Sequence, residues 1–107
     1  MSENNLYSPI SLKKAVEYSP NSIVSKTIVE NDGGVITLFA FDAGQNLSEH
    51  TAPFDSVAII IEGSADIFID GKLNSLSEGE MIIMPADIPH AIKCSERFKM
   101  LLVMIQK

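Results

Sequence analysis

Two histidines, His50 and His90, are the residues of this chain best suited to carry out chemistry. Imidazole is the commonest metal ligand in proteins, and it is the side chain that gains or loses a proton near neutral pH. His50 lies in a polar segment that begins at Gly44 and leads into an apolar run, and His90 closes a second segment that begins at Gly79. This placement of one histidine in each of two segments is the main indication of function in the sequence.

Cys94 is the only cysteine, which excludes an intrachain disulfide, a thiolate zinc knuckle and a dithiol redox motif. It lies in an apolar neighbourhood, and we predict that it is an inert strand residue rather than a nucleophile. Residues 1–9 have neither the basic start nor the apolar centre of a secretory signal. Together these features predict a cytoplasmic protein.

The composition, with 46% hydrophobic and 21% charged residues in a chain of 107, is typical of a single globular domain. Eight Lys and Arg against fourteen Asp and Glu give a formal net charge of -6, without any basic run. We therefore expect no nucleic-acid partner and no docking on an anionic membrane, because both require clustered positive charge. No apolar run approaches the ~20 residues that a membrane-spanning helix needs.

The elements that must position the histidines are short strands. One near-helical pattern at 11–18 ends before Pro20 and predicts at most a short helix or turn. Eight later segments are rich in β-branched or alternating apolar residues and are separated by Gly, Pro, Asn and Asp. They are 22–30, 35–41, 57–62, 65–69, 72–76, 81–84, 90–95 and 98–105. We expect the segment after Gly44, which carries His50, to be a loop.

Two turn signals indicate antiparallel hairpins. Asp70 and Gly71 form a dipeptide favoured in two-residue turns, because both positions take positive φ, and residues 31–34 are Asn-Asp-Gly-Gly. The short spacings leave no room for crossover helices, so we predict an all-β fold, as a sandwich or barrel. We assign residues 1–21 to an N-terminal extension and residues 22–107 to one β-barrel domain.

The two histidine segments resemble the two sequence motifs of the cupins, a family of small jelly-roll barrels. The first motif corresponds to Gly44, His50, Ala52, Ser56 and Gly63, and the second to Gly79, Pro85, Asp87, His90 and Cys94. The phrases Glu-His-Thr-Ala-Pro and Met-Pro-Ala-Asp-Ile-Pro-His are similar to those of small bacterial single-domain cupins. The resemblance implies an antiparallel jelly-roll β-barrel.

Metal-binding cupins take two histidines and a glutamate from the first motif and one histidine from the second. His50 and His90 match the first and last of these ligands, whereas Ala52 and Ser56 occupy the other two positions. The resemblance thus implies a degenerate site, in which a divalent iron, manganese, nickel, copper or zinc ion is weakly held or absent. Ala52 and Ser56 then belong to the pocket wall, where Ala52 leaves more room than an imidazole.

Asp55 is the candidate third ligand, and two interpretations of it remain open. A bulge or one-residue shift would turn its carboxylate inward, giving the two-histidine, one-carboxylate set typical of non-haem iron. Alternatively, Asp55 follows Pro53 and Phe54 as an ordinary solvated turn residue, a role that aspartate often has.

The leading functional interpretation is a cupin barrel that binds a small molecule in its interior, beside His50 and His90. The alternative is a metal-dependent enzyme, a dioxygenase or an isomerase, that uses both histidines and Asp55 as ligands. The resemblance also implies a homodimer, in which the long strand at 22–30 pairs with the sheet of the neighbouring subunit and covers an exposed edge.

Overall fold

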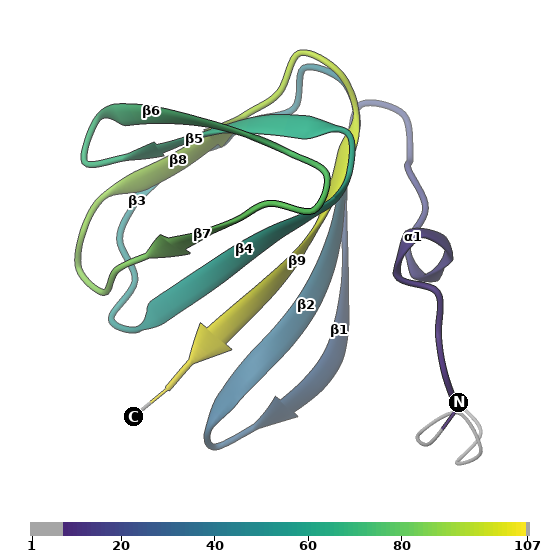
Figure 1. Cartoon of the computed structure of the whole chain (residues 1–107), viewed down its shortest axis with the longest axis horizontal. Coiled ribbons are helices and arrows are strands. Elements are labelled where there is room, and N and C mark those ends of the chain that lie inside the picture. The colour runs from purple at the N-terminus through teal and green to yellow at the C-terminus, as the bar shows by residue number, and fades with distance from the viewer. Residues whose placement is uncertain (1–7, 107) are drawn as a thin grey trace.

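The computed structural model describes residues 8–106, which form nine strands and one short helix (Figure 1). The helix is α1 (Leu12–Ala15). The strands are β1 (Ile23–Asn31), β2 (Gly34–Phe41), β3 (Leu47–His50), β4 (Asp55–Glu62), β5 (Ser64–Ile69), β6 (Lys72–Ser77), β7 (Met81–Met84), β8 (His90–Lys93) and β9 (Phe98–Ile105). All strands except β3 agree with a predicted segment to within two residues, and β7 and β9 agree at both ends.

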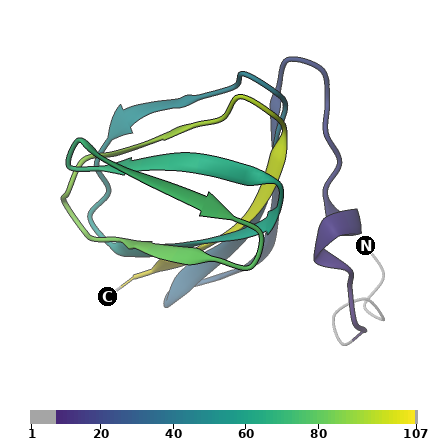
Figure 2. The ribbon, with the colours of Figure 1, turned by 45° about the horizontal axis from the view of Figure 1, so that its top comes forward.

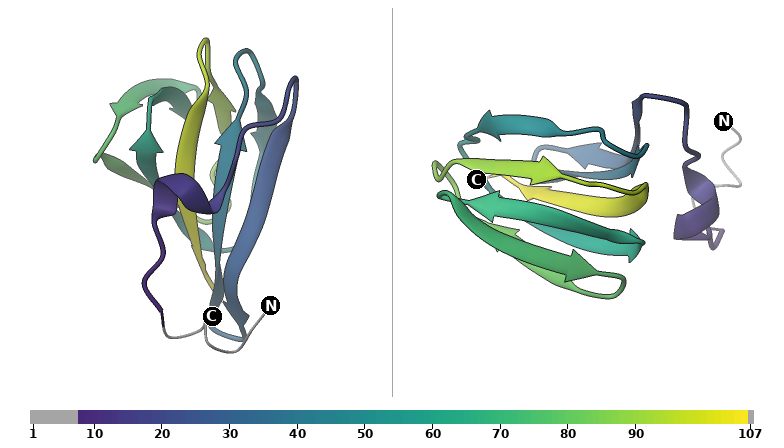
Figure 3. Two further views of the ribbon diagram at one scale, coloured as in Figure 1. Left: turned by 90° about the vertical axis from the view of Figure 1, so that its right-hand side faces the viewer. Right: turned by 90° about the horizontal axis from the view of Figure 1, so that it is seen from above.

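Two antiparallel sheets face each other and form a jelly-roll barrel. The first sheet has the strand order β1-β2-β9-β4-β7, and the second has the order β3-β8-β5-β6. Figure 2 shows the strands of both sheets curving around a common interior, and the view from above in Figure 3 shows them as layers. The predicted all-β antiparallel barrel is therefore confirmed.

Local turn chemistry explains two of the hairpins. Asp70 and Gly71 join β5 to β6 with φ angles of 52° and 80°, so both take the left-handed conformation that the dipeptide predicts. Between β1 and β2, the Asn31 side chain accepts a 2.8 Å hydrogen bond from the amide of Gly33. This contact closes the tip of the hairpin, where Asn31 pairs with Gly34.

The space between the sheets is filled by aliphatic and aromatic side chains. The buried rings of Phe41 and Phe98 stack with their centroids 4.5 Å apart, and Met84 and Met100 pack in the same cluster. Met81, also on β7, is by contrast 53% exposed. Side chains alternate along β7, so the burial of Met84 directs Met81 to the outer face.

The N-terminal extension packs on the outer face of the five-stranded sheet. Val16 follows α1 and is buried against Leu38 and Ala40 of β2, whose neighbours Phe39 and Phe41 point into the barrel. The left view of Figure 3 shows α1 in front of the sheet. This short helix is therefore held by tertiary contact, since four residues cannot form a stable helix alone.

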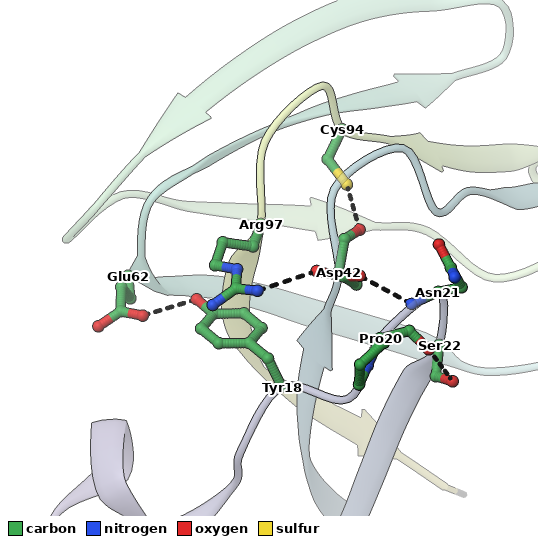
Figure 4. Close-up of polar contacts among 8 residues, drawn as sticks. All are labelled: Tyr18, Pro20, Asn21, Ser22, Asp42, Glu62, Cys94 and Arg97. Atoms are coloured by element: carbon green, nitrogen blue, oxygen red, sulfur yellow. Dashed lines mark hydrogen bonds and ion pairs between the residues drawn. The ribbon is translucent and has the colours of Figure 1, made fainter.

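A polar cluster joins the extension to the barrel (Figure 4). The hydroxyl of Tyr18 donates a 2.6 Å hydrogen bond to Oε2 of Glu62, and Arg97 lies 4.4 Å from the centre of the Tyr18 ring. Arg97 also forms a 3.2 Å ion pair with Asp42. The pKa of Asp42 lies below its ordinary value, chiefly because the backbone amide of Asn21 donates to its carboxylate.

The structure differs from the prediction most clearly at β3. The sequence predicts a loop after Gly44, but Leu47–His50 is a strand that pairs with β8. Three of its four residues are polar and exposed, so the segment lacks the apolar alternation by which strands are recognised. Among residues 8–106, no helix has the length and apolar character needed to cross a membrane.

Candidate functional site

Strands β3 and β8 bring the two histidines together. They are neighbours in the four-stranded sheet, and His50 at the end of β3 pairs directly with His90 at the start of β8. The loop before β8 turns at Asp87, whose φ is 64°. The amide of Asp87 donates a 2.8 Å hydrogen bond to the carbonyl of Ala52, which ties the loop after His50 to the loop before His90.

The two imidazole rings meet through their Nε2 atoms. These atoms lie 3.1 Å apart, with the ring centroids separated by 4.3 Å and the ring planes inclined at 69°. Sequence analysis places one histidine in each motif, and the structure brings these two side chains into direct contact. We call them the histidine pair.

Backbone carbonyls set the tautomer of both rings. Nδ1 of His50 lies 2.8 Å from the carbonyl oxygen of Ser48, and Nδ1 of His90 lies 3.3 Å from that of Ile88. A carbonyl oxygen can only accept a hydrogen bond, so Nδ1 carries the proton in each ring. In neutral rings, both Nε2 atoms then hold lone pairs directed at each other. A cation between the rings, either a proton or a metal ion, relieves this repulsion.

The two members of the pair have different environments. His90 is buried, with 6% of its surface exposed, whereas His50 is exposed. Burial lowers the pKa of His90 below its ordinary value, and the neighbouring His50 ring lowers it further. At neutral pH His90 is therefore an uncharged imidazole, which is the form that binds a metal ion.

A comparison with protein families identifies the fold family of this chain. The model for the cupin domain matches residues 37–105, which include β2 to β9 and both histidines. The chain belongs to the cupin family. No curated protein matches its sequence.

Several solved structures are similar to this chain over nearly all its length. A conserved Streptococcus pyogenes protein of unknown function is 36% identical, with a TM-score of 0.89, 94% of this chain covered and 89% of the other. A cupin superfamily protein from Desulfitobacterium hafniense is 30% identical, with a TM-score of 0.88 and coverages of 94% and 93%. For a cupin 2 conserved barrel domain protein from Leptotrichia buccalis, the identity is 37%, the TM-score 0.87, and the coverages 91% and 47%. This cupin thus spans about half the length of the Leptotrichia protein.

The remaining motif positions of this cupin carry small side chains. Ala52 is half-buried in the loop after β3, and Ser56 is 3% exposed on β4. Ser56 lies on the same face of β4 as Ala58 and Ile60, both of which belong to the core cluster. Its side chain therefore faces the barrel interior, where the resemblance predicts a pocket wall.

Asp55 has a partner away from the histidine pair. Its Oδ1 accepts a 2.8 Å hydrogen bond from the amide of Ala86, and the residue is exposed. The carboxylate therefore anchors the loop that follows β7 to the start of β4. In this arrangement Asp55 lies among the solvated residues rather than beside His50 and His90.

The donor atoms present suit a weak metal site. Within residues 8–106, no three or more His, Cys, Asp or Glu side chains gather closely enough to hold a metal ion. The histidine pair nevertheless fits one ion, because two nitrogens that each bind at about 2.0–2.1 Å must lie within about 4 Å of each other. His50 and His90 would hold such an ion, and water or a ligand would fill the remaining positions.

Cys94 is remote from this chemistry. It lies just after β8 rather than within a strand, and its buried Sγ donates to the carbonyl of Gln45 at 3.2 Å. Burial raises the pKa of the thiol, so the nucleophilic thiolate is disfavoured. These contacts agree with the predicted inert role.

A concave region lies on the outer face of the four-stranded sheet, away from the histidine pair, and sequence analysis does not anticipate it. It is an open hollow of about 470 Å³, lined in part by Ser48, Glu49 and Phe68. The ammonium group of Lys93 lies 5.3 Å from the centre of the Phe68 ring. Its lining residues include neither member of the histidine pair.

Proposed function

We propose that this cupin binds a small-molecule ligand beside His50 and His90, with a divalent metal ion held weakly between the two imidazoles. The observation that carries the proposal is the approach of the two Nε2 atoms to 3.1 Å while both Nδ1 atoms face backbone carbonyls. Such a pair offers a metal ion two nitrogen lone pairs that point toward one position, and the two rings offer no further ligand atom. A bound cation would be stabilised there by both rings at once.

The protein orients both rings and gives the buried ring of His90 an apolar surrounding. The carbonyls of Ser48 and Ile88 hold the two rings in one tautomer, as the hydrogen-bond partners of metal-binding histidines do. Ile69 pairs directly with His90 across the sheet and packs against the core, so one side of the buried ring is apolar. A metal ion bound here would polarise an oxygen atom of the ligand.

The wall around the pair favours a modest apolar or mixed ligand. Ala52 and Ser56 replace two larger polar side chains of metal-binding cupins, and the partly buried Leu47 and Ile69 add apolar surface. The ligand would contact the histidine pair through an oxygen or nitrogen atom and the aliphatic side chains through its carbon atoms. This division is typical of small-molecule sites, which combine a few polar groups with apolar walls.

The first experiment is elemental analysis of the untagged protein, purified without chelator, followed by calorimetric titration with manganese, nickel, copper and zinc and anaerobically with ferrous iron. We expect about one ion per chain at saturation, bound more weakly than at a site with three protein ligands. His90→Ala should abolish this binding. Glu49→Ala is the matched control, because Glu49 is exposed next to His50 and should leave binding unchanged.

The outcomes separate the two functional interpretations. Tight stoichiometric metal together with oxygen-dependent turnover would favour the dioxygenase alternative and overturn a purely binding role. Metal binding that survives in His90→Ala would refute the proposed site. If no ion binds even in excess, the metal part of the proposal fails. A ligand screen by thermal shift, comparing wild type with His90→Ala, then tests the binding part.

A further inference from the structure

The strand register places a cation in line with the histidine pair on the inner face of the four-stranded sheet. His50 pairs with His90, and His90 pairs with Ile69 of β5. Ile69 in turn pairs with Lys72, the first residue of β6. Residues paired directly across antiparallel strands share a face, and Ile69 packs against the barrel core. Lys72 therefore starts from the same inner face as the two imidazoles.

Two hydrogen bonds hold the backbone of this line in place. The amide of Asp70, in the turn before Lys72, donates a 2.8 Å hydrogen bond to the carbonyl of Pro89, which precedes His90. The side chain of Asn74 donates a 3.1 Å hydrogen bond to the carbonyl of Lys72. The turn between β5 and β6 and the loop before β8 thus lie at the same end of the barrel (Figure 1).

Lys72 differs from the other cations of the chain in its direction and in its lack of a partner. The strand lysines that the register directs to outer faces are Lys26, Lys93 and Lys99. Within residues 8–106 the two ion pairs involve Lys13 and Arg97, and the ammonium group of Lys72 has neither an ion-pair nor a hydrogen-bond partner. The residue is exposed. An unpaired positive charge therefore lies at the rim of the barrel interior.

The inner face of the four-stranded sheet carries no opposing carboxylate. The next register row consists of Leu47, Ile92, Ile67 and Asn74. These four strands hold two acidic residues, and both face outward: Asp66 accepts a hydrogen bond from Ser75, and Glu49 lines the hollow on the outer face. An anion beside this wall would therefore meet a positive group and no negative one.

The spacing along the line limits the size of a ligand that could reach both ends of it. Directly paired residues have Cβ atoms about 5 Å apart, so those of Lys72 and His90, with Ile69 between them, are about 10 Å apart. The flexible stem of a lysine can lie along the apolar surface of Ile69 and carry its ammonium group toward the rings. A linear molecule of about four to six carbons would fill the interval that remains.

We propose that the ligand of the histidine pair is a short aliphatic dicarboxylic acid, with one carboxylate held by Lys72 and the other at His50 and His90. This inference rests on the proposed function and names the class of its ligand. The ammonium group would bind a carboxylate by charge-assisted hydrogen bonds. A cation between the imidazoles would attract the second carboxylate, and Ile69 would contact the carbon chain.

Calorimetric titration of the full-length protein with linear dicarboxylates of about three to eight carbons, with and without one equivalent of zinc, tests the inference. We expect the lowest dissociation constant for acids of about four to six carbons, because these match the interval between the two ends. The corresponding diamides have the same lengths without the charges. They should bind about tenfold or more weakly, since they make no charge-assisted contact.

Lys72→Met should raise the dissociation constant of the best acid about tenfold or more, because it removes the charge and keeps an unbranched apolar side chain. Lys72→Arg keeps the charge and should restore most of the affinity. Lys93→Met is the matched control, because it removes the same charge from the outer face of the same sheet. Its affinity for the acids should equal that of wild type.

The other outcomes overturn the inference, and they separate its failure from that of the proposed function. Acids and diamides that bind equally well, in a manner lost in His90→Ala, would refute the role of Lys72 and leave the proposed function standing. Equal losses in Lys72→Met and Lys93→Met would show only an effect of net charge. If no acid binds in either state, the inference fails. The proposed function fails with it only if the ligand screen also finds no compound whose binding depends on His90.

Discussion

His50 and His90 face each other through Nε2 atoms 3.1 Å apart, although forty residues separate them in the chain. Each ring is held by a carbonyl two residues before it, at Ser48 and Ile88. The pair is therefore pre-arranged by strand geometry, and substitutions around it should change metal affinity without changing the fold.

Restoring a histidine at position 52 should strengthen metal binding. Ala52→His would add the second imidazole of the cupin motif, and we expect affinity for zinc or nickel to rise about tenfold or more, since a third protein ligand completes a typical site. Calorimetric titration measures the change. Ala43→His, on an exposed loop residue, is the control for a histidine added elsewhere. An unchanged affinity in Ala52→His would contradict the proposed placement of the site.

The stability of the protein should fall as the pH drops below about 6.5, in part because of His90. Its pKa is lowered in the folded state from an ordinary value of 6.5, chiefly by burial. Between the two values the unfolded chain binds more protons, so the free energy of unfolding decreases as the pH falls through this window. Above pH 6.5 this contribution is fully present.

Urea unfolding of metal-free protein from pH 5 to 8 tests this dependence. Carboxylates also titrate at the acidic end, so the useful quantity is the difference between wild type and His90→Gln. We expect a shallower loss of stability in the variant, which lacks the titrating imidazole. Parallel curves for the two proteins would show that His90 does not contribute.

Gly63 should tolerate alanine poorly because of both its conformation and its surroundings. Its φ is +78°, and an added Cβ would lie 2.7 Å from the carbonyl oxygen of Arg97. The left-handed conformation alone costs about 1–2 kcal/mol for alanine, and the backbone clash adds to it. We expect Gly63→Ala to lower the free energy of unfolding by more than about 2 kcal/mol, measured by urea denaturation.

Gly71→Ala is the matched control for this substitution. Gly71 has a φ of +80°, but an added Cβ would meet nothing within 4 Å. The free energy of unfolding of this variant should therefore fall only by the cost of the left-handed conformation, about 1–2 kcal/mol. Equal losses in the two variants would refute the role of the contact with Arg97.

The Tyr18 hydroxyl should contribute to stability through its 2.6 Å hydrogen bond to Glu62. Tyr18→Phe removes this bond and keeps the ring beneath Arg97, so we expect a loss of about 1 kcal/mol at neutral pH. Tyr18→Leu also removes the ring and should lower the free energy of unfolding by about 0.5–1 kcal/mol more than Tyr18→Phe does. Unfolding by urea measures both, and identical stability of wild type and Tyr18→Phe would contradict the prediction.

Much of the fold can be predicted because its signals are local. β7 is a continuous apolar run, β9 is apolar except for Lys99, and both are bounded by polar or turn residues, so their observed ends agree with the prediction. Asp70 and Gly71 take positive φ, as this dipeptide does in two-residue hairpin turns. The strand β3 cannot be recognised in this way, because its polar residues become a strand only by pairing with β8.

The sequence by itself determined the residue types at the site: two histidines at motif positions, with Ala52 and Ser56 where cupins place other ligands. Only the tertiary structure decided that the two rings meet, that Asp55 bonds to the loop at Ala86, and that Met81 faces outward. The reason is physical. Composition and spacing specify local conformation, whereas the contacts of a β-barrel form between strands that are distant in the chain and depend on register, which is fixed when the sheets close.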